Sequence, residues 1–282
     1  MSGSATERDR GPNGAVRGRQ SKSRNSPLAR PLIAPPFADL SPLPRARVAA
    51  MRQAARELFA VLERCARDGR HPVSELLAAS PEGFTRWCYY PPDPVADASS
   101  GSAWFYHAHD PSEARQWDEH GHFHCFTSAK KLARGAKPIA LPPDPDPEKE
   151  RTVHLAALSI HGSGVPKRLF TTNRWVTGEW MYEARAVAPL VDRFAIRSDK
   201  RFHLTSRWLS ALLRLFHPQI AWLLQERDRA IGERRASGAT DFTEDQTVEA
   251  VSVIEIDVDA QLAALDRAWE ARPGARGGAR AK

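Results

Sequence analysis

Five histidines lie between His107 and His124, in the segments SAWFYHAHD and EHGHFHCF. Imidazole is a good ligand for divalent metals such as Zn, Fe or Mn, and two histidines in an HxH pattern can bind one ion. Without a metal, the same side chains can act as general acids and bases near neutral pH. The cluster therefore predicts either a metal site or metal-free acid–base chemistry.

The alternating spacing of these histidines indicates β-strands. A strand sends every second side chain to the same face, so His107 and His109 share a face, as do His120, His122 and His124. If the two strands pair antiparallel with His109 opposite His120, then His107 lies opposite His122 and the two rows meet. A register shifted by one residue places the rows on opposite faces. The sequence leaves both registers open.

If the rows meet, we expect a divalent metal, Zn, Fe or Mn, with all five histidines as candidate ligands. Glu119 is a candidate ligand or base, and His154 can complete the set from a neighbouring strand. Such an ion activates water or binds an oxygen-bearing substrate. The opposing interpretation is that the histidines only pack within aromatic-rich strands.

A second group of polar residues occurs in LFTTNRWVTGEW, which follows a predicted strand. Thr177 or Gly178 can cap a helix predicted over residues 179–194, with Glu179 in its first turn. In functional terms, Arg174 is the candidate clamp for an anionic substrate, helped by Asn173. We therefore predict substrate binding by Asn173 and Arg174. The candidate catalytic residues are Glu119, His122, Arg174 and Glu179.

The elements that must position these residues follow from periodicity. Apolar residues recur at helical spacing over residues 45–67, and helices are also expected over 72–79, 203–216 and 218–235. Strands are expected over residues 102–109, 120–127, 152–160 and 167–173, with a late strand within 247–256. Residues 138–150 are expected to form a Pro/Asp-rich loop. The pattern predicts an α+β fold with a central, mainly antiparallel sheet flanked by N- and C-terminal helices.

The net charge of +7 belongs to the two ends of the chain. Residues 1–30 have seven Lys/Arg against two acidic residues, and residues 271–282 have four Lys/Arg and no acid, which leaves −2 between them. We therefore predict a disordered or extended basic arm over residues 1–44, a single domain over 45–271 and a disordered basic tail over 272–282. The core is not expected to bind nucleic acid, although the tails can do so weakly.

Three cysteines without CxxC spacing argue against a disulfide framework or a cysteine zinc site. We found no apolar run long enough for a membrane span and no apolar core of a secretory signal near the N-terminus. We therefore expect a cytoplasmic protein without a membrane partner.

The string HGHFHCF resembles the signature of the histidine-triad nucleotide hydrolases and transferases, in which three alternating histidines occupy one strand. The resemblance implies His122 as the nucleophile that attacks a phosphate, supported by His120 and His124. Gly121 departs from that signature, because it replaces an apolar spacer.

The order YHAHD, EHGHFHCF, HLAALSI and LFTTNRWVTGE also resembles a family of uncharacterised bacterial proteins catalogued as a domain of unknown function. The resemblance implies no activity or cofactor. Three hypotheses therefore remain: a histidine-lined pocket, with or without a divalent metal, that binds or hydrolyses a small anionic substrate; histidine-triad-like phosphoryl chemistry at His122; and a non-catalytic interaction module whose basic tails carry the function.

Overall fold

The computed structural model describes residues 39–78, 89–108, 118–146, 151–238 and 242–272. Most of the predicted N-terminal arm, almost all of the predicted C-terminal tail, and His109 lie outside the described residues. The described part contains helices and a mainly antiparallel sheet, which confirms the predicted α+β class.

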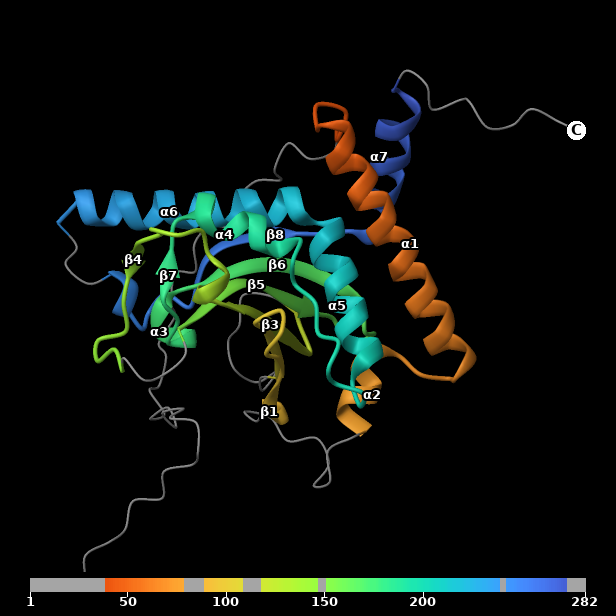
Figure 1. The fold of residues 1–282 in the computed structure, drawn as a ribbon, viewed down its shortest axis with the longest axis horizontal. Helices are drawn as coiled ribbons and strands as arrows, with labels where there is room; N and C mark the ends of the chain where they lie inside the picture. Colours follow the sequence, from red (N-terminus) through yellow and green to blue (C-terminus); the bar gives the residue numbers. More distant parts are fainter. Residues whose placement is uncertain (1–38, 79–88, 109–117, 147–150, 239–241, 273–282) are drawn as a thin grey trace, which may run out of the picture.

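The main sheet has six strands in the order β1-β2-β3-β5-β6-β8, and every neighbouring pair is antiparallel (Figure 1). Their bounds are β1 Tyr89–Asp97, β2 Ser102–Ala108, β3 Gly121–Ser128, β5 Thr152–Ile160, β6 Pro166–Thr172 and β8 Ala250–Glu255. Two short strands, β4 (Pro138–Ala140) and β7 (Met181–Tyr182), form a second sheet.

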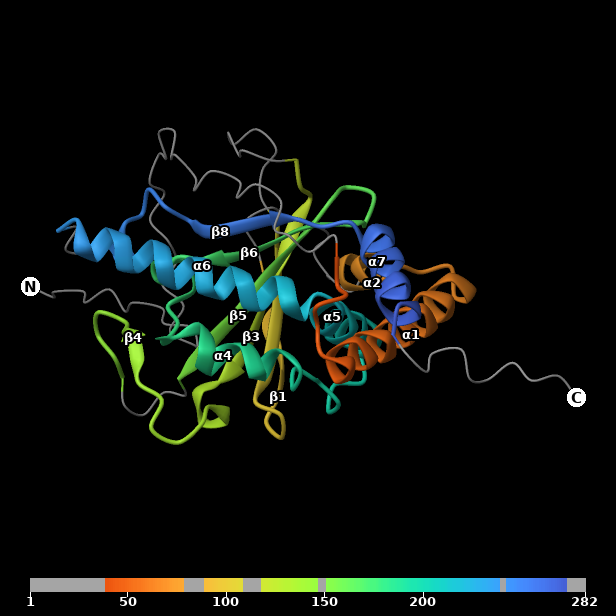
Figure 2. The ribbon, with the colours of Figure 1, turned by 90° about the horizontal axis from the view of Figure 1, so that it is seen from above.

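The longer helices lie on one face and one end of the main sheet. They are α1 (Arg45–Arg67), α4 (Ala184–Val191), α5 (His203–Leu215), α6 (His217–Ala236) and α7 (Val258–Glu270). Helices α4 and α6 run across the sheet, while α1 and α7 lie side by side at one end (Figures 1 and 2). The guanidinium groups of Arg45 and Arg52 contact the ring of Trp269, which joins α1 to α7. A short helix, α2 (Pro72–Ala78), follows α1.

The main core lies between the sheet and these helices. Trp104 of β2 packs against Phe123 of β3, and Phe123 packs against Trp208 of α5. The Trp104 indole N–H donates to the Ser206 hydroxyl at 2.9 Å, so its only polar atom is satisfied in the core. Because side chains alternate along a strand, the residues between these aromatic rings point to the opposite face of the sheet.

Several predicted elements match closely and others differ. Helix α1 and strand β5 have the expected bounds, and β8 lies within the expected segment. Strand β1 was not predicted, because Pro91, Pro92 and Pro94 interrupt its pattern. Proline is tolerated at this position because β1 is an edge strand. The predicted loop over residues 138–150 was wrong at its start, where β4 pairs with β7.

The predicted helix over residues 179–194 was also wrong at its start. Asn173 instead caps a one-turn helix, α3 (Arg174–Thr177), by accepting the backbone N–H of Arg174 at 3.0 Å. Gly178 ends α3 in the left-handed region at φ 63°, a conformation that favours glycine. The chain then forms β7 and only afterwards α4.

No helix in the described ranges is both long and apolar enough to cross a membrane.

Candidate metal centre

The pairing of β2 with β3 places His107 opposite His122. This is the register in which the two histidine rows meet, so the structure confirms that alternative. His122 and His124 are almost fully buried, at 3% and 2% exposure, whereas His107 is partly exposed.

His107, His122 and His124, here called the histidine group, each offer one nitrogen, and these three nitrogens lie within 4.8 Å of one another. Adjacent ring centroids are 5.8 Å apart for His107 and His122 and 4.7 Å apart for His122 and His124. Zn–N bonds of about 2.0–2.1 Å in a tetrahedral site separate ligand nitrogens by roughly 3.3 Å. Small side-chain rotations therefore bring the group to ligand spacing.

Glu119 lies directly behind His122. Its Oε1 is 3.1 Å from Nδ1 of His122, and its side chain is 1% exposed. A carboxylate that accepts the Nδ1 proton of a histidine fixes the ring and makes Nε2 a stronger metal ligand. Glu119 is thus placed to orient His122.

His154 of β5 holds the ring of His124 in a similar way. Its Nε2 is 3.2 Å from Nδ1 of His124, and its Nδ1 is 3.3 Å from the hydroxyl of Thr172. Burial, reinforced by the positive charge of Arg227, lowers the pKa of His154 to about 3. The His154 ring is therefore neutral and carries a single proton.

His120 does not join the histidine group. Its Nδ1 is 2.6 Å from the hydroxyl of Tyr106, and the two rings stack. Tyr106 packs against Phe123 on the helix-covered side of the sheet, so His120 leaves the row that alternation predicts. Gly121 permits this path, because a Cβ there would lie 2.6 Å from the Tyr106 hydroxyl and 2.5 Å from the His107 carbonyl oxygen.

The polar side chains of α3 have partners within the chain. Arg174 is 3% exposed and forms a two-bonded ion pair with Glu244, while the Asn173 amide donates to the carbonyl oxygen of Phe242 at 2.8 Å. The anion that Arg174 holds in this structure is therefore Glu244. Substrate binding by Asn173 and Arg174 stays a prediction.

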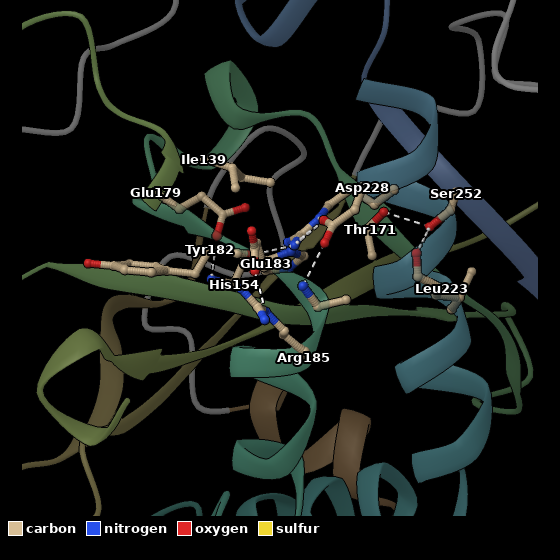
Figure 3. Close-up of polar contacts among 12 residues, drawn as sticks. Ile139, His154, Thr171, Glu179, Tyr182, Glu183, Arg185, Leu223, Asp228 and Ser252 are labelled. Atoms are coloured by element: carbon tan, nitrogen blue, oxygen red, sulfur yellow. Dashed lines mark hydrogen bonds and ion pairs between the residues drawn. The ribbon is translucent and has the colours of Figure 1, made fainter. Parts of the chain in front are cut away.

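Glu179 lies next to the first residues of β5. Its Oε2 accepts the backbone N–H of His154 at 2.7 Å (Figure 3). The backbone N–H of Trp180 donates to the carbonyl oxygen of Thr152. The Glu179 side chain is fully buried, and burial raises its pKa to about 7 against the opposing effect of Arg227. Its catalytic role stays a prediction. Its hydrogen bond to the backbone of His154 connects the segment after α3 to the residues around the histidine group.

Two residues that sequence analysis did not single out share the face of His122. Ser159 lies opposite His122 in the β3–β5 pair, and Arg168 lies opposite Ser159 in the β5–β6 pair. Residues directly opposite in adjacent strands share a face. We call this set the cross-strand row. Its members are His107, His122, Ser159, Arg168 and Glu255. Side-chain alternation along β5 and β6 indicated which residues of each strand share a face. Only the strand order and register show which residues of different strands lie opposite one another.

The neighbouring row on the same face is largely apolar. The ring of Phe170 lies 5.2 Å from His122, and that of Phe105 lies 5.0 Å from His124. Ala157, Phe170, Ala250 and Val253 form a small buried cluster beside the histidines. The polar atoms of this face are thus gathered against an apolar surface, which strengthens electrostatic interactions.

Comparison with known proteins gives a family and no activity. No curated protein and no solved structure matches the chain. A family model described as a domain of unknown function matches residues 52–256, a range that contains the histidine group, the cross-strand row and α3. The expected assignment to a family of unknown function is confirmed, and the chain belongs to the DUF6969 family.

Proposed function

We propose that this protein is a metal-dependent hydrolase that binds one divalent ion through His107, His122 and His124 and acts on a small anionic substrate. The observation that carries the proposal is the convergence of three imidazole nitrogens within 4.8 Å. Zinc is the first candidate, because three histidines with a further position for water form a common catalytic zinc site. The ion supplies a Lewis acid and a bound water of lowered pKa.

The hydrogen bonds around the group support this assignment. With Nε2 of His124 as the ligand atom, its Nδ1 carries the proton and donates to Nε2 of His154. Nδ1 of His154 then donates to the Thr172 hydroxyl, which agrees with a neutral His154 ring. Each proton in this chain has one acceptor, so the tautomers are mutually consistent.

The carboxylate of Glu119 supports the same assignment at His122. With Nε2 of His122 as the ligand atom, Nδ1 donates to Glu119 at 3.1 Å. The histidine-triad alternative needs His120 beside His122, whereas His120 is hydrogen-bonded to Tyr106. The geometry therefore favours metal binding over phosphoryl transfer to His122.

The test is elemental analysis of untagged protein purified from cells grown with added Zn, Fe or Mn. We expect stoichiometric metal in the native chain and its loss in the double variant His122→Ala/His124→Ala. The matched control is His203→Ala, because His203 is exposed at the start of α5. Circular dichroism verifies that all variants fold.

Two results would contradict the proposal. One is that the native protein contains no metal after growth in any of these conditions and also binds none when metal is added to the purified protein. The other is stoichiometric metal that stays in the double variant. Covalent labelling of His122 by a nucleoside phosphoramidate would instead favour the histidine-triad alternative.

A further inference from the structure

A buried hydroxyl lies next to the histidine group without a hydrogen-bond partner. Ser159 is fully buried, and within the described part of the chain its Oγ has no donor or acceptor in reach. Burying an unsatisfied hydroxyl costs stability, so such groups call for an explanation. Ser159 lies opposite His122 in one neighbouring strand and opposite Arg168 in the other, so it stands in the row between a metal-ligand candidate and an arginine.

The Arg168 side chain contacts residues on both sides of β6. Its Nη1 donates to the carbonyl oxygen of Asp118 at 3.3 Å, in the segment that leads into β3, and its Nη2 contacts Glu255 at 2.7 Å. The Arg168 side chain is 17% exposed, whereas that of Glu255 is 74% exposed. An ion pair with a solvated carboxylate is weak, so another anion can replace Glu255.

We propose that Ser159 and Arg168 form an oxyanion-binding subsite that takes the carboxylate or phosphate group of the substrate beside the metal centre. This inference rests on the proposed function, because it names the group by which the anionic substrate is held. The Ser159 hydroxyl donates to one oxygen, and the Arg168 guanidinium donates to the same group through its planar fork.

The spacing of the sheet fits this arrangement. Adjacent strands are about 4.8 Å apart, so the backbones at His122 and Arg168 are separated by roughly 10 Å, with Ser159 halfway. This separation matches the length of a small substrate that would contact the ion with one end and Ser159 and Arg168 with its oxyanion. Arg174, the arginine that the sequence favoured for this role, is paired with Glu244 and lies in α3, beyond the end of β6.

The experiment measures anion binding separately from metal binding. Metal-loaded protein is titrated with inorganic phosphate and, in a second arm, with acetate, by isothermal calorimetry. Ser159→Ala and Arg168→Gln are each expected to lower the affinity for the more tightly bound of the two anions about tenfold or more, because each loses a hydrogen bond to a charged group. Metal content is expected to stay unchanged in both variants.

Matched controls are Ser237→Ala, near the end of α6, and Arg185→Gln, an arginine of α4 with an 87% exposed side chain. Both are expected to bind anion like the native chain. Ser159→Ala removes only a buried oxygen, so it should unfold at the same or a higher temperature. Arg168→Lys keeps the charge without the fork and should be intermediate, which covers the case that Arg168→Gln does not fold.

The outcomes separate the two proposals. Two results would overturn the subsite and leave the metal centre standing. In one, Ser159→Ala and Arg168→Lys hold stoichiometric metal and bind the anion with native affinity. In the other, the native chain holds metal but shows no saturable anion binding. If the native chain holds no metal, the titration is repeated on metal-free protein. Anion binding that still depends on Ser159 supports the subsite alone, and binding that does not depend on it overturns both.

Discussion

Replacing Glu179 by glutamine should change how the stability of the protein depends on pH. The glutamine oxygen can still accept the backbone N–H of His154, but it cannot ionise. Burial raises the pKa of Glu179 to about 7 from its ordinary value of 4.5. The folded chain therefore holds a proton that the unfolded chain releases between these two values, and stability falls as pH rises through this window.

The size of the effect follows from the shift. A difference of about 2.5 units at about 1.36 kcal/mol per unit gives roughly 3 kcal/mol. At pH 4.5 and below, this contribution is fully present in the native chain and is lost progressively towards pH 7 and above. Glu179→Gln lacks the loss, so the variant should become more stable than the native chain by up to roughly 3 kcal/mol at pH 8.

The assay is urea unfolding of both proteins at intervals from pH 4.5 to 8, with a chelator present so that proton-linked metal release does not contribute. Comparing the two proteins at each pH cancels the titration of the histidines. Glu183→Gln is the matched control, because the Glu183 side chain is 46% exposed and its variant should follow the native profile.

A stability difference that stays constant with pH would refute the reasoning. A native chain that is more stable than Glu179→Gln at pH 8 would refute it more strongly, because the attraction of Arg227 for the Glu179 carboxylate would then outweigh the cost of burying it.

Three further variants test other parts of the structure. Glu119→Gln keeps an acceptor for His122 but removes the charge, so metal affinity in chelator competition should fall about 10–100-fold; unchanged affinity would deny Glu119 its orienting role. Gly121→Ala brings a methyl group within 2.5 Å of the His107 carbonyl oxygen and should lower the free energy of unfolding, measured in urea, by about 1–3 kcal/mol. Unchanged stability would show that β2 and β3 move apart enough to accommodate the methyl group. The Asp97 carboxylate accepts the Ser99 hydroxyl and several backbone N–H groups, which lower its pKa, so Asp97→Asn should cost about 1.5–3 kcal/mol at pH 7. Because that pKa is lowered on folding, this cost should shrink as pH falls below about 4, and a cost independent of pH would contradict the role.

Much of the fold could be predicted because local patterns specify it. The apolar stripe of α1 recurs at steps of three and four, and β5 consists mainly of β-branched and apolar residues, with His154 and Ser159 among them. Strand β1 could not be predicted in this way, since its prolines are acceptable only at the edge of a sheet, and edge position depends on the complete strand order.

The site was predictable only in part, for the same reason. Alternation placed His122 and His124 on one face, but whether His107 joined them depended on register. His120 departed from the row because the Tyr106 hydroxyl offers it a hydrogen bond. Ser159 and Arg168 carried no signal of their own, since each becomes informative only when β5 is known to lie between β3 and β6.

Four of the five residues of the cross-strand row come from two successive hairpins, and the fifth, Glu255, comes from β8. His107 and His122 come from the β2–β3 hairpin, and Ser159 and Arg168 come from the β5–β6 hairpin. Under the two proposals, metal binding and anion recognition are encoded in separate stretches of sequence that meet only where β3 pairs with β5. A change confined to the second hairpin would then alter the anion that is bound without altering the residues that bind the ion.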